Sequence, residues 1–147
     1  TKAEIADLKA VYHFRAGLEE MRFNKPGGVR ITPRKDNYPH FPPVLNPIVW
    51  VHPETQRKVL NVSTLNIDHM QGMPIADGDA LIERLIAHIV QPQFQYIHDW
   101  DINDMVVWDN RRTLHTALGH PADQIRVVHR TTIKGDIQMG EILEDVA

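Results

Sequence analysis

Two arginines and one histidine near the C-terminal end of the sequence have the chemistry of an anion site beside a metal ligand. Arg126 and Arg130 lie in a β-type run at 125–133, where alternate side chains share one face of a strand. Their guanidinium groups would then point the same way, about 13 Å apart at roughly 3.3 Å per residue. His115 lies between this run and an apolar run at 105–108, and none of its immediate neighbours is a strong metal ligand.

The same pattern has a simpler interpretation. An Arg-Val-Arg face is also what the solvent-exposed side of an antiparallel sheet looks like. A single histidine is more often structural than metal-binding, and His129 falls on the face opposite the arginines. Spacing alone leaves both interpretations open.

Longer motifs make the functional interpretation more specific. The order Trp108-Asp109-Asn110-Arg111, His115, Arg126, Arg130 closely resembles the C-terminal signature of the Fe(II)/2-oxoglutarate-dependent dioxygenases of the taurine dioxygenase family. Upstream, the segment 52–58 resembles the family's His-Pro-x-Thr-Gly-Arg-Lys turn, with Gln56 where glycine is usual. Segment 72–74 and Trp100 also fit, and the subgroup that degrades phenoxyalkanoates is the most similar.

The resemblance implies a role for each of four residues. His115 matches the distal histidine ligand of iron, and Arg126 matches the arginine that pairs with the distal carboxylate of 2-oxoglutarate. A guanidinium suits that task because it donates two parallel hydrogen bonds. Arg130 matches the residue that meets the anionic end of the substrate, and Trp108 matches an aromatic near the iron pocket. His115 and Arg126 are thus candidate catalytic residues, with Trp108 and Arg126 beside the cofactor.

The resemblance also implies a fold and a reaction. The fold would be mainly β with flanking helices, a double-stranded β-helix or jelly roll of which this chain supplies the C-terminal half. With Fe(II), 2-oxoglutarate and O2, such an enzyme hydroxylates a small anionic organic substrate. A sulfonate, an alkyl sulfate or an aryloxyalkanoate would fit Arg130. Family members also commonly self-associate, so a homo-oligomer is expected.

One part of the iron site is missing from the sequence. Iron sites of this kind need two histidines and a carboxylate, and the proximal pair in the family is His-x-Asp, which occurs nowhere among the nine histidines. The adjacent pairs Asp68-His69 and His98-Asp99 are poor substitutes, because neighbouring strand residues face opposite ways. His52-x-Glu54 has a suitable spacing, but its turn lies well downstream of the iron pair in the family and is interpreted as structural.

Two other functions remain open. Without the proximal ligands, the chain would be a non-catalytic fragment or assembly domain built on the same β scaffold. A weaker alternative is a cupin-like metal hydrolase or isomerase that uses His115, His120 and His129, although His120-Pro121 has the pattern of a loop.

Composition sets broad limits on the kind of protein. The chain has 147 residues, 42% of them hydrophobic and 24% charged, which suits one globular domain. A net charge of −3 gives no overall attraction to nucleic acid or to an anionic membrane. Cysteine is absent, so metal ligands must come from His, Asp or Glu. The apolar runs are too short for a membrane span, and a cytoplasmic location is expected.

Local patterns predict the elements that would position the site. Residues 1–23 carry apolar side chains at helical spacing and predict an amphipathic helix. The proline-rich stretch 24–47 predicts a long loop, for which two interpretations stay open: a lid over the substrate, or a disordered or oligomer-contacting segment. Residues 48–147 predict jelly-roll strands, including a hairpin around 53–56, strands at 94–100, 105–108 and 125–133, and one helix at about 78–90.

Overall fold

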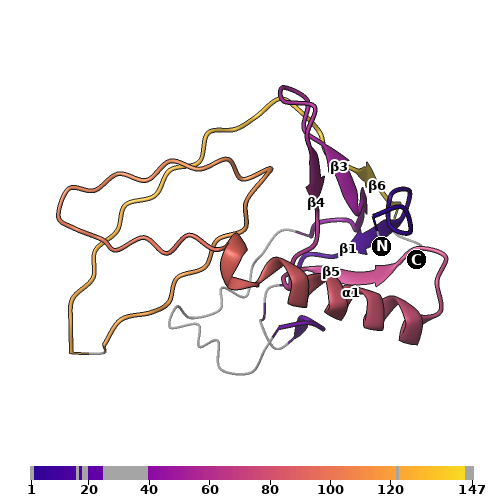
Figure 1. Cartoon of the computed structure of the whole chain (residues 1–147), viewed down its shortest axis with the longest axis horizontal. Coiled ribbons are helices and arrows are strands. Elements are labelled where there is room, and N and C mark those ends of the chain that lie inside the picture. Colours follow the sequence, from indigo (N-terminus) through magenta and orange to yellow (C-terminus); the bar gives the residue numbers. More distant parts are fainter. Residues whose placement is uncertain (1, 16, 18–19, 25–39, 122, 145–147) are drawn as a thin grey trace.

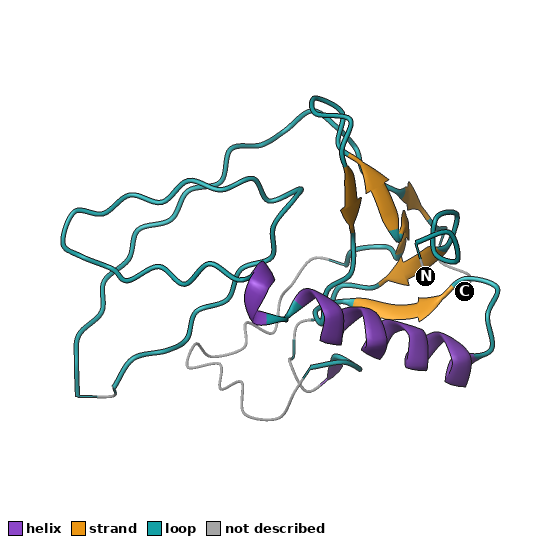
Figure 2. Ribbon diagram, in the orientation of Figure 1, coloured by secondary structure: helices purple, strands orange, loops and turns teal. Residues whose placement is uncertain are grey.

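The structure, a computed structural model, describes residues 2–15, 17, 20–24, 40–121 and 123–144. In this part of the chain, two β-sheets and one α-helix form a folded body (Figure 1). Long segments that are neither helix nor strand extend away from it, coloured teal in Figure 2. None of the helices in the described ranges is long and apolar enough to cross a membrane.

The strands form two antiparallel sheets. The strands are β1 Lys9–Tyr12, β2 Val44–Pro47, β3 Val49–Val51, β4 Lys58–Leu60, β5 Ile67–Met70 and β6 Glu141–Ile142, and the helices are α1 Ile75–Ile89 and the 3-10 helix η2 Pro92–Phe94. The larger sheet has the order β5-β1-β2-β6, and β3 pairs with β4 alone. The described strands do not close into a barrel.

The helix predicted over residues 1–23 is wrong. Residues 2–7 form turns, and β1 follows as an inner strand that pairs with β2 on one side and β5 on the other. Ala10 is fully buried in this position, with an exposed fraction of 0%. The helical spacing of Ile5, Leu8 and Val11 indicates only a weak local preference for helix. Pairing along both edges of β1 overrides that preference.

The loop predicted over 24–47 is wrong at its C-terminal end, where β2 forms. Leu45 is buried at the middle of this strand, and Pro47 is its last residue, opposite Lys9 of β1. A proline is tolerated there because its missing N–H coincides with the end of the ladder. Residues 25–39, the centre of the predicted loop, lie outside the described residues.

The β3–β4 hairpin forms where the sequence predicts it. Val49 pairs with Leu60 and Val51 with Lys58. Gln56, which stands where the resembled motif has glycine, adopts a positive φ of 56° in the connecting turn. Its side-chain amide donates a 2.7 Å hydrogen bond to the carbonyl of Pro53. The turn therefore keeps a backbone conformation that favours glycine, even though glycine is absent.

The helix predicted at about 78–90 is confirmed as α1, which packs its apolar stripe on β5. Its N-cap is Pro74, and Asp77 lies in its first turn. Gly78 sits so close to β5 that an added Cβ would lie 3.1 Å from the Cβ of Met70. The core cluster that joins helix and sheets consists of Ile5, Ala10, Ile48, Val62, Ile67, Met70, Leu81, Ile82, Leu85 and Ile86.

Residues 95–121 and 123–140, which we name the excursion, leave the body as extended chain and return to it at β6 (Figure 1, orange to yellow). The strands predicted at 94–100, 105–108 and 125–133 are absent from these described residues. Ile125 is 95% exposed and Ile133 is 91% exposed. A β-type sequence forms a strand only when a neighbour satisfies its backbone groups, and the excursion has no such neighbour in the described chain.

Replacing Gln56 with glycine should stabilise the protein. Gln56→Gly relieves the cost of a left-handed backbone conformation, roughly 1–2 kcal/mol, while losing only one exposed hydrogen bond and some chain entropy. We expect a net gain of about 0.5–1 kcal/mol in the free energy of unfolding, measured by urea denaturation. The matched control is Asn103→Gly, at φ 72°, which should gain nothing because asparagine tolerates this conformation. Equal effects of the two changes would contradict the strain at Gln56.

Candidate functional site

The turn before His115 is organised by Asp109. One carboxylate oxygen, Oδ1, accepts the backbone N–H of Arg111 at 2.8 Å. The Asp109 carbonyl accepts the N–H groups of Arg112 and Thr113, each at 3.1 Å, and the Thr113 hydroxyl at 2.8 Å. The N–H of Arg111 and then the hydrogen bond from His52 hold the pKa of Asp109 below its ordinary value. This carboxylate therefore stays ionised at neutral pH and closes the turn around itself.

Trp108 and His115 lie against each other across this turn. Their ring centroids are 4.9 Å apart and their planes are inclined by 53°. The indole N–H of Trp108 donates a 2.8 Å hydrogen bond to Oδ1 of Asn110, which fixes the orientation of the ring. Two of the residues predicted for the iron pocket are thus in direct contact, although both are accessible to solvent.

His52 connects the turn of the β3–β4 hairpin to Asp109. Its ring is buried, with an exposed fraction of 4%. Nδ1 faces the backbone N–H groups of Glu54 and Thr55, each at 3.3 Å, and Nε2 lies 2.9 Å from Oδ2 of Asp109. Because Nδ1 faces two donors, it carries no proton, and the proton resides on Nε2, which donates to Asp109. Both nitrogens are engaged, in agreement with the structural role inferred for this turn.

Arg126 and Arg130 are both exposed, and the strand expected to align them on one face does not form in the described excursion. Within the described ranges, neither guanidinium forms an ion pair with an acidic side chain. They therefore retain the capacity to bind an anion, and their roles remain predictions.

The described residues do not supply a complete metal site. No three of their His, Asp and Glu side chains come together in a group that could hold a metal ion. His115 offers one imidazole, whereas an Fe(II) site of the predicted type needs two histidines and a carboxylate. The described part of this chain therefore does not fit Fe(II) without further ligands.

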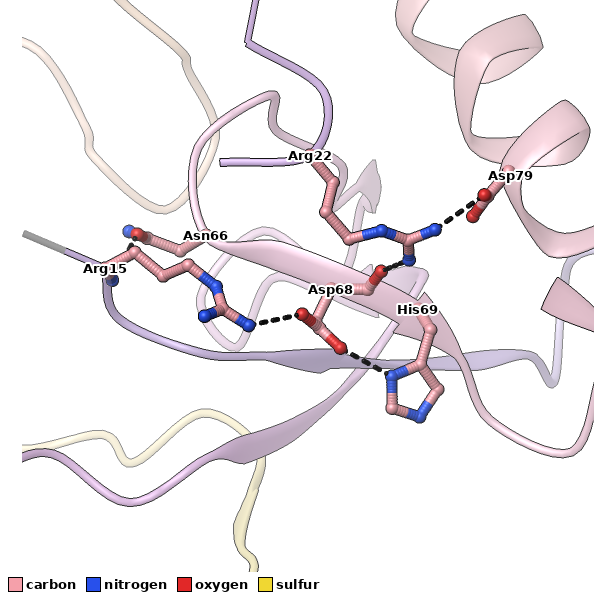
Figure 3. Close-up of polar contacts among 6 residues, drawn as sticks. All are labelled: Arg15, Arg22, Asn66, Asp68, His69 and Asp79. Carbon is pink, nitrogen blue, oxygen red and sulfur yellow. Dashed lines mark hydrogen bonds and ion pairs between the residues drawn. The ribbon is translucent and has the colours of Figure 1, made fainter. Parts of the chain in front are cut away.

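A second cluster, which sequence analysis missed, surrounds Asp68 on β5 (Figure 3). Arg15 Nη2 contacts Oδ1 of Asp68 at 2.9 Å, and His69 Nδ1 contacts Oδ2 at 2.8 Å. Arg22 donates to the Asp68 carbonyl and, at 2.6 Å, to Oδ2 of Asp79 on α1. The arginines thereby fasten the segment after β1 to both β5 and the helix.

A β-bulge explains why the adjacent residues Asp68 and His69 can touch. Val11 of β1 pairs with His69 and Tyr12 pairs with Ile67, so Asp68 is an extra residue in the ladder. The argument that these two side chains face opposite ways is therefore wrong, because a bulge interrupts the alternation. The available signal was the sequence of β5, in which the apolar Ile67 and Met70 are three residues apart rather than two.

Residues 1–132 match the family described as "Taurine catabolism dioxygenase TauD, TfdA family". The match covers most of the chain, which therefore belongs to this family, as its motifs predicted. The 2,4-dichlorophenoxyacetate dioxygenase of Burkholderia sp. (strain RASC) is 36% identical over 95 residues, 65% of this chain and 32% of the relative. The alkylsulfatase of Acinetobacter baylyi is 35% identical over 95 residues, 65% of this chain and 30% of the relative.

The fold is confirmed by comparison with solved structures. A crystal structure of AAD-2 in complex with Mn(II) and N-oxalylglycine is 32% identical, with a TM-score of 0.58, and the match covers 76% of this chain and 41% of that one. The mainly β architecture is accordingly part of a jelly roll. The chain spans about a third of the length of the curated relatives it matches.

Replacing Asp68 with asparagine should weaken the protein and change its response to acid. Burial alone would raise the pKa of Asp68, but hydrogen bonds from His69 and Arg15, together with their charges, outweigh burial and lower it below 3.8. A lowered pKa in the folded state adds stability above the unfolded pKa, and that stability is lost as the pH falls through the folded value. Asp68→Asn should cost about 1 kcal/mol at pH 7.

The measurement is the free energy of unfolding at pH 7 and at several points below pH 4. The difference between wild type and Asp68→Asn should shrink as the pH falls. Glu83→Gln, on the exposed face of α1, is the control and should leave the stability almost unchanged. A difference that stays constant down to the lowest pH would contradict ion pairing at Asp68.

Proposed function

We propose that this chain forms part of an Fe(II)- and 2-oxoglutarate-dependent dioxygenase that hydroxylates a small anionic organic substrate. The observation that carries the proposal is the family match over residues 1–132, a range that contains His115, Arg126 and Arg130. The names of the relatives point the same way, since they are an α-ketoglutarate-dependent dioxygenase of an aryloxyacetate and an alkylsulfatase. The substrate class is therefore a sulfonate, an alkyl sulfate or an aryloxyalkanoate.

His115 would be the iron ligand that this chain contributes. Its ring rests against Trp108, and a tightly hydrogen-bonded turn precedes it. The other two ligands would come from elsewhere, because no three His, Asp or Glu side chains among the described residues come together as a metal site. When bound, Fe(II) with 2-oxoglutarate and O2 would supply the oxidising chemistry. The Mn(II) and N-oxalylglycine in the AAD-2 structure are chemically suited to stand in for that metal and that keto acid.

Arg126 and Arg130 would hold the two anionic partners. Arg126 would bind the distal carboxylate of 2-oxoglutarate through two charge-assisted hydrogen bonds. Arg130, four residues further along the chain, would bind the carboxylate or sulfate end of the substrate. Neither is neutralised by an acidic side chain within the described ranges, which keeps both available for this task. A cytoplasmic location and self-association complete the proposal.

A non-catalytic assembly role is the second candidate function. It is favoured by the lack of a His-x-Asp motif in the sequence and of a three-ligand cluster among the described residues. The discriminating experiment measures succinate release from the natural polypeptide that contains this chain, with and without Fe(II), across a panel of sulfonates, alkyl sulfates and aryloxyalkanoates. Iron-dependent release stimulated by one class would support the dioxygenase, and no release with any class would favour assembly.

Arg126→Lys should weaken binding of 2-oxoglutarate. Lysine keeps the positive charge but cannot donate two parallel hydrogen bonds, a loss of about 1.5–3 kcal/mol or roughly 10- to 100-fold in affinity. The measurement is the dissociation constant of 2-oxoglutarate for the same natural polypeptide, by calorimetry under anaerobic conditions. Arg84→Lys on α1 is the matched control and should bind normally. Unchanged affinity in Arg126→Lys would show that another residue holds the carboxylate.

A further inference from the structure

The excursion carries every residue predicted for the iron and substrate sites, yet it has little packing of its own. Its apolar side chains are largely exposed, and it forms no strand among its described residues. The position of His115 must therefore be set by specific contacts with the body. One such contact is the 2.9 Å hydrogen bond between His52 of the hairpin and Asp109 of the excursion, which are separated by 57 positions in the sequence.

His52 is a rigid anchor for this contact. Its imidazole is buried and lies edge-on to Trp50, with ring centroids 5.5 Å apart. The N–H groups of Glu54 and Thr55 occupy Nδ1, so that the ring cannot turn over without losing both bonds. The Nε2–H therefore points in a fixed direction, at Oδ2 of Asp109.

Asp109 links His52 to the turn that follows Trp108, because the same residue bonds to both. Oδ2 is held by His52, while Oδ1 and the carbonyl accept donors from residues 111–113. Trp108 directly precedes this turn and His115 follows it, and their rings are in contact. A continuous series of short contacts thus leads from the hairpin to the His115 imidazole.

We propose that His52 is a positioning residue, which acts through Asp109 to hold His115 and Trp108 in place for metal binding. The inference deepens the proposed function and rests on it for the role of His115 as an iron ligand. The part that concerns geometry, namely that the His52–Asp109 bond sets the Trp108–His115 contact, can be tested without any metal.

The first variant is Asp109→Asn. His52 and the N–H of Arg111 reach different oxygens of Asp109, and asparagine replaces one of these oxygens with an NH2 group that donates, so either the link or the turn is lost. The second variant is His52→Phe, which keeps a buried ring but cannot donate to Asp109. The matched control is Asp104→Asn, because Asp104 also binds a histidine, His98, at 3.1 Å, but within the excursion.

Two measurements are made on the natural polypeptide that contains this chain. Nuclear Overhauser contacts between isotope-labelled Trp108 and His115 report the geometry without metal, and titration with Mn(II) reports metal affinity. Both variants should lose or weaken the ring contact and bind Mn(II) about tenfold more weakly, the size typical of disturbed outer-shell partners. Combining the two changes should add nothing beyond the stronger single effect, because both act through one bond.

Unchanged ring contacts and unchanged Mn(II) affinity in both variants would overturn the inference, as would an equal loss in Asp104→Asn. A loss of ring contacts in a protein that binds no Mn(II) even as wild type would support the positioning by His52 and refute the proposed iron site. The two proposals therefore fail in distinguishable ways.

Discussion

Pairing of backbone groups between neighbouring strands is the constraint on which this structure depends. Where β1 lies between β2 and β5, even a sequence with helical spacing is drawn into a strand, and its central alanine becomes fully buried. Where no neighbour is available, strongly β-type runs such as 125–133 remain extended and exposed. The same requirement explains the ordered body and the open excursion.

Charged groups reinforce the sheet at the place where pairing is irregular. The extra residue in β5 turns Asp68 toward His69, and two arginines from the segment after β1 gather around it. Arg22 satisfies an outward carbonyl of β5, the outermost strand on its side of the sheet. Covering an edge with a charged side chain is a common way of preventing unwanted strand addition.

The sequence predicted those parts of the fold that local chemistry determines. The hairpin around Pro53 and the helix with its apolar stripe were both found, because turn residues and an uninterrupted 3.6-residue period are local signals. The family was also identified, since its motifs are specific. The strand at β1 depends on partners distant in the sequence, which no local pattern contains. The bulge at Asp68 leaves a local trace only in the three-residue spacing of Ile67 and Met70.

The sequence proposes residues for the candidate site, but it does not show which contacts hold them in place. Trp108 and His115 do lie in contact, whereas Arg126 and Arg130 were expected on a strand that needs a neighbour to exist. The turn that contains His52 was interpreted as structural, but the bond from His52 to Asp109 joins residues too far apart in the sequence for spacing to reveal. The roles of the site residues therefore stay predictions, and the contact between His52 and Asp109 is what residue spacing could not predict.

The excursion is attached to the folded body at its two ends, which decides how well changes in its length are tolerated. At one end Gln95 donates to the carbonyl of Val90 at the end of α1, and at the other β6 pairs with β2. The entropic cost of closing such a loop grows only with the logarithm of its length, about 0.6 kcal/mol for each doubling. Insertions and deletions between these two ends, away from the turn at 108–115 and from Arg126 and Arg130, should therefore cost the folded body little stability.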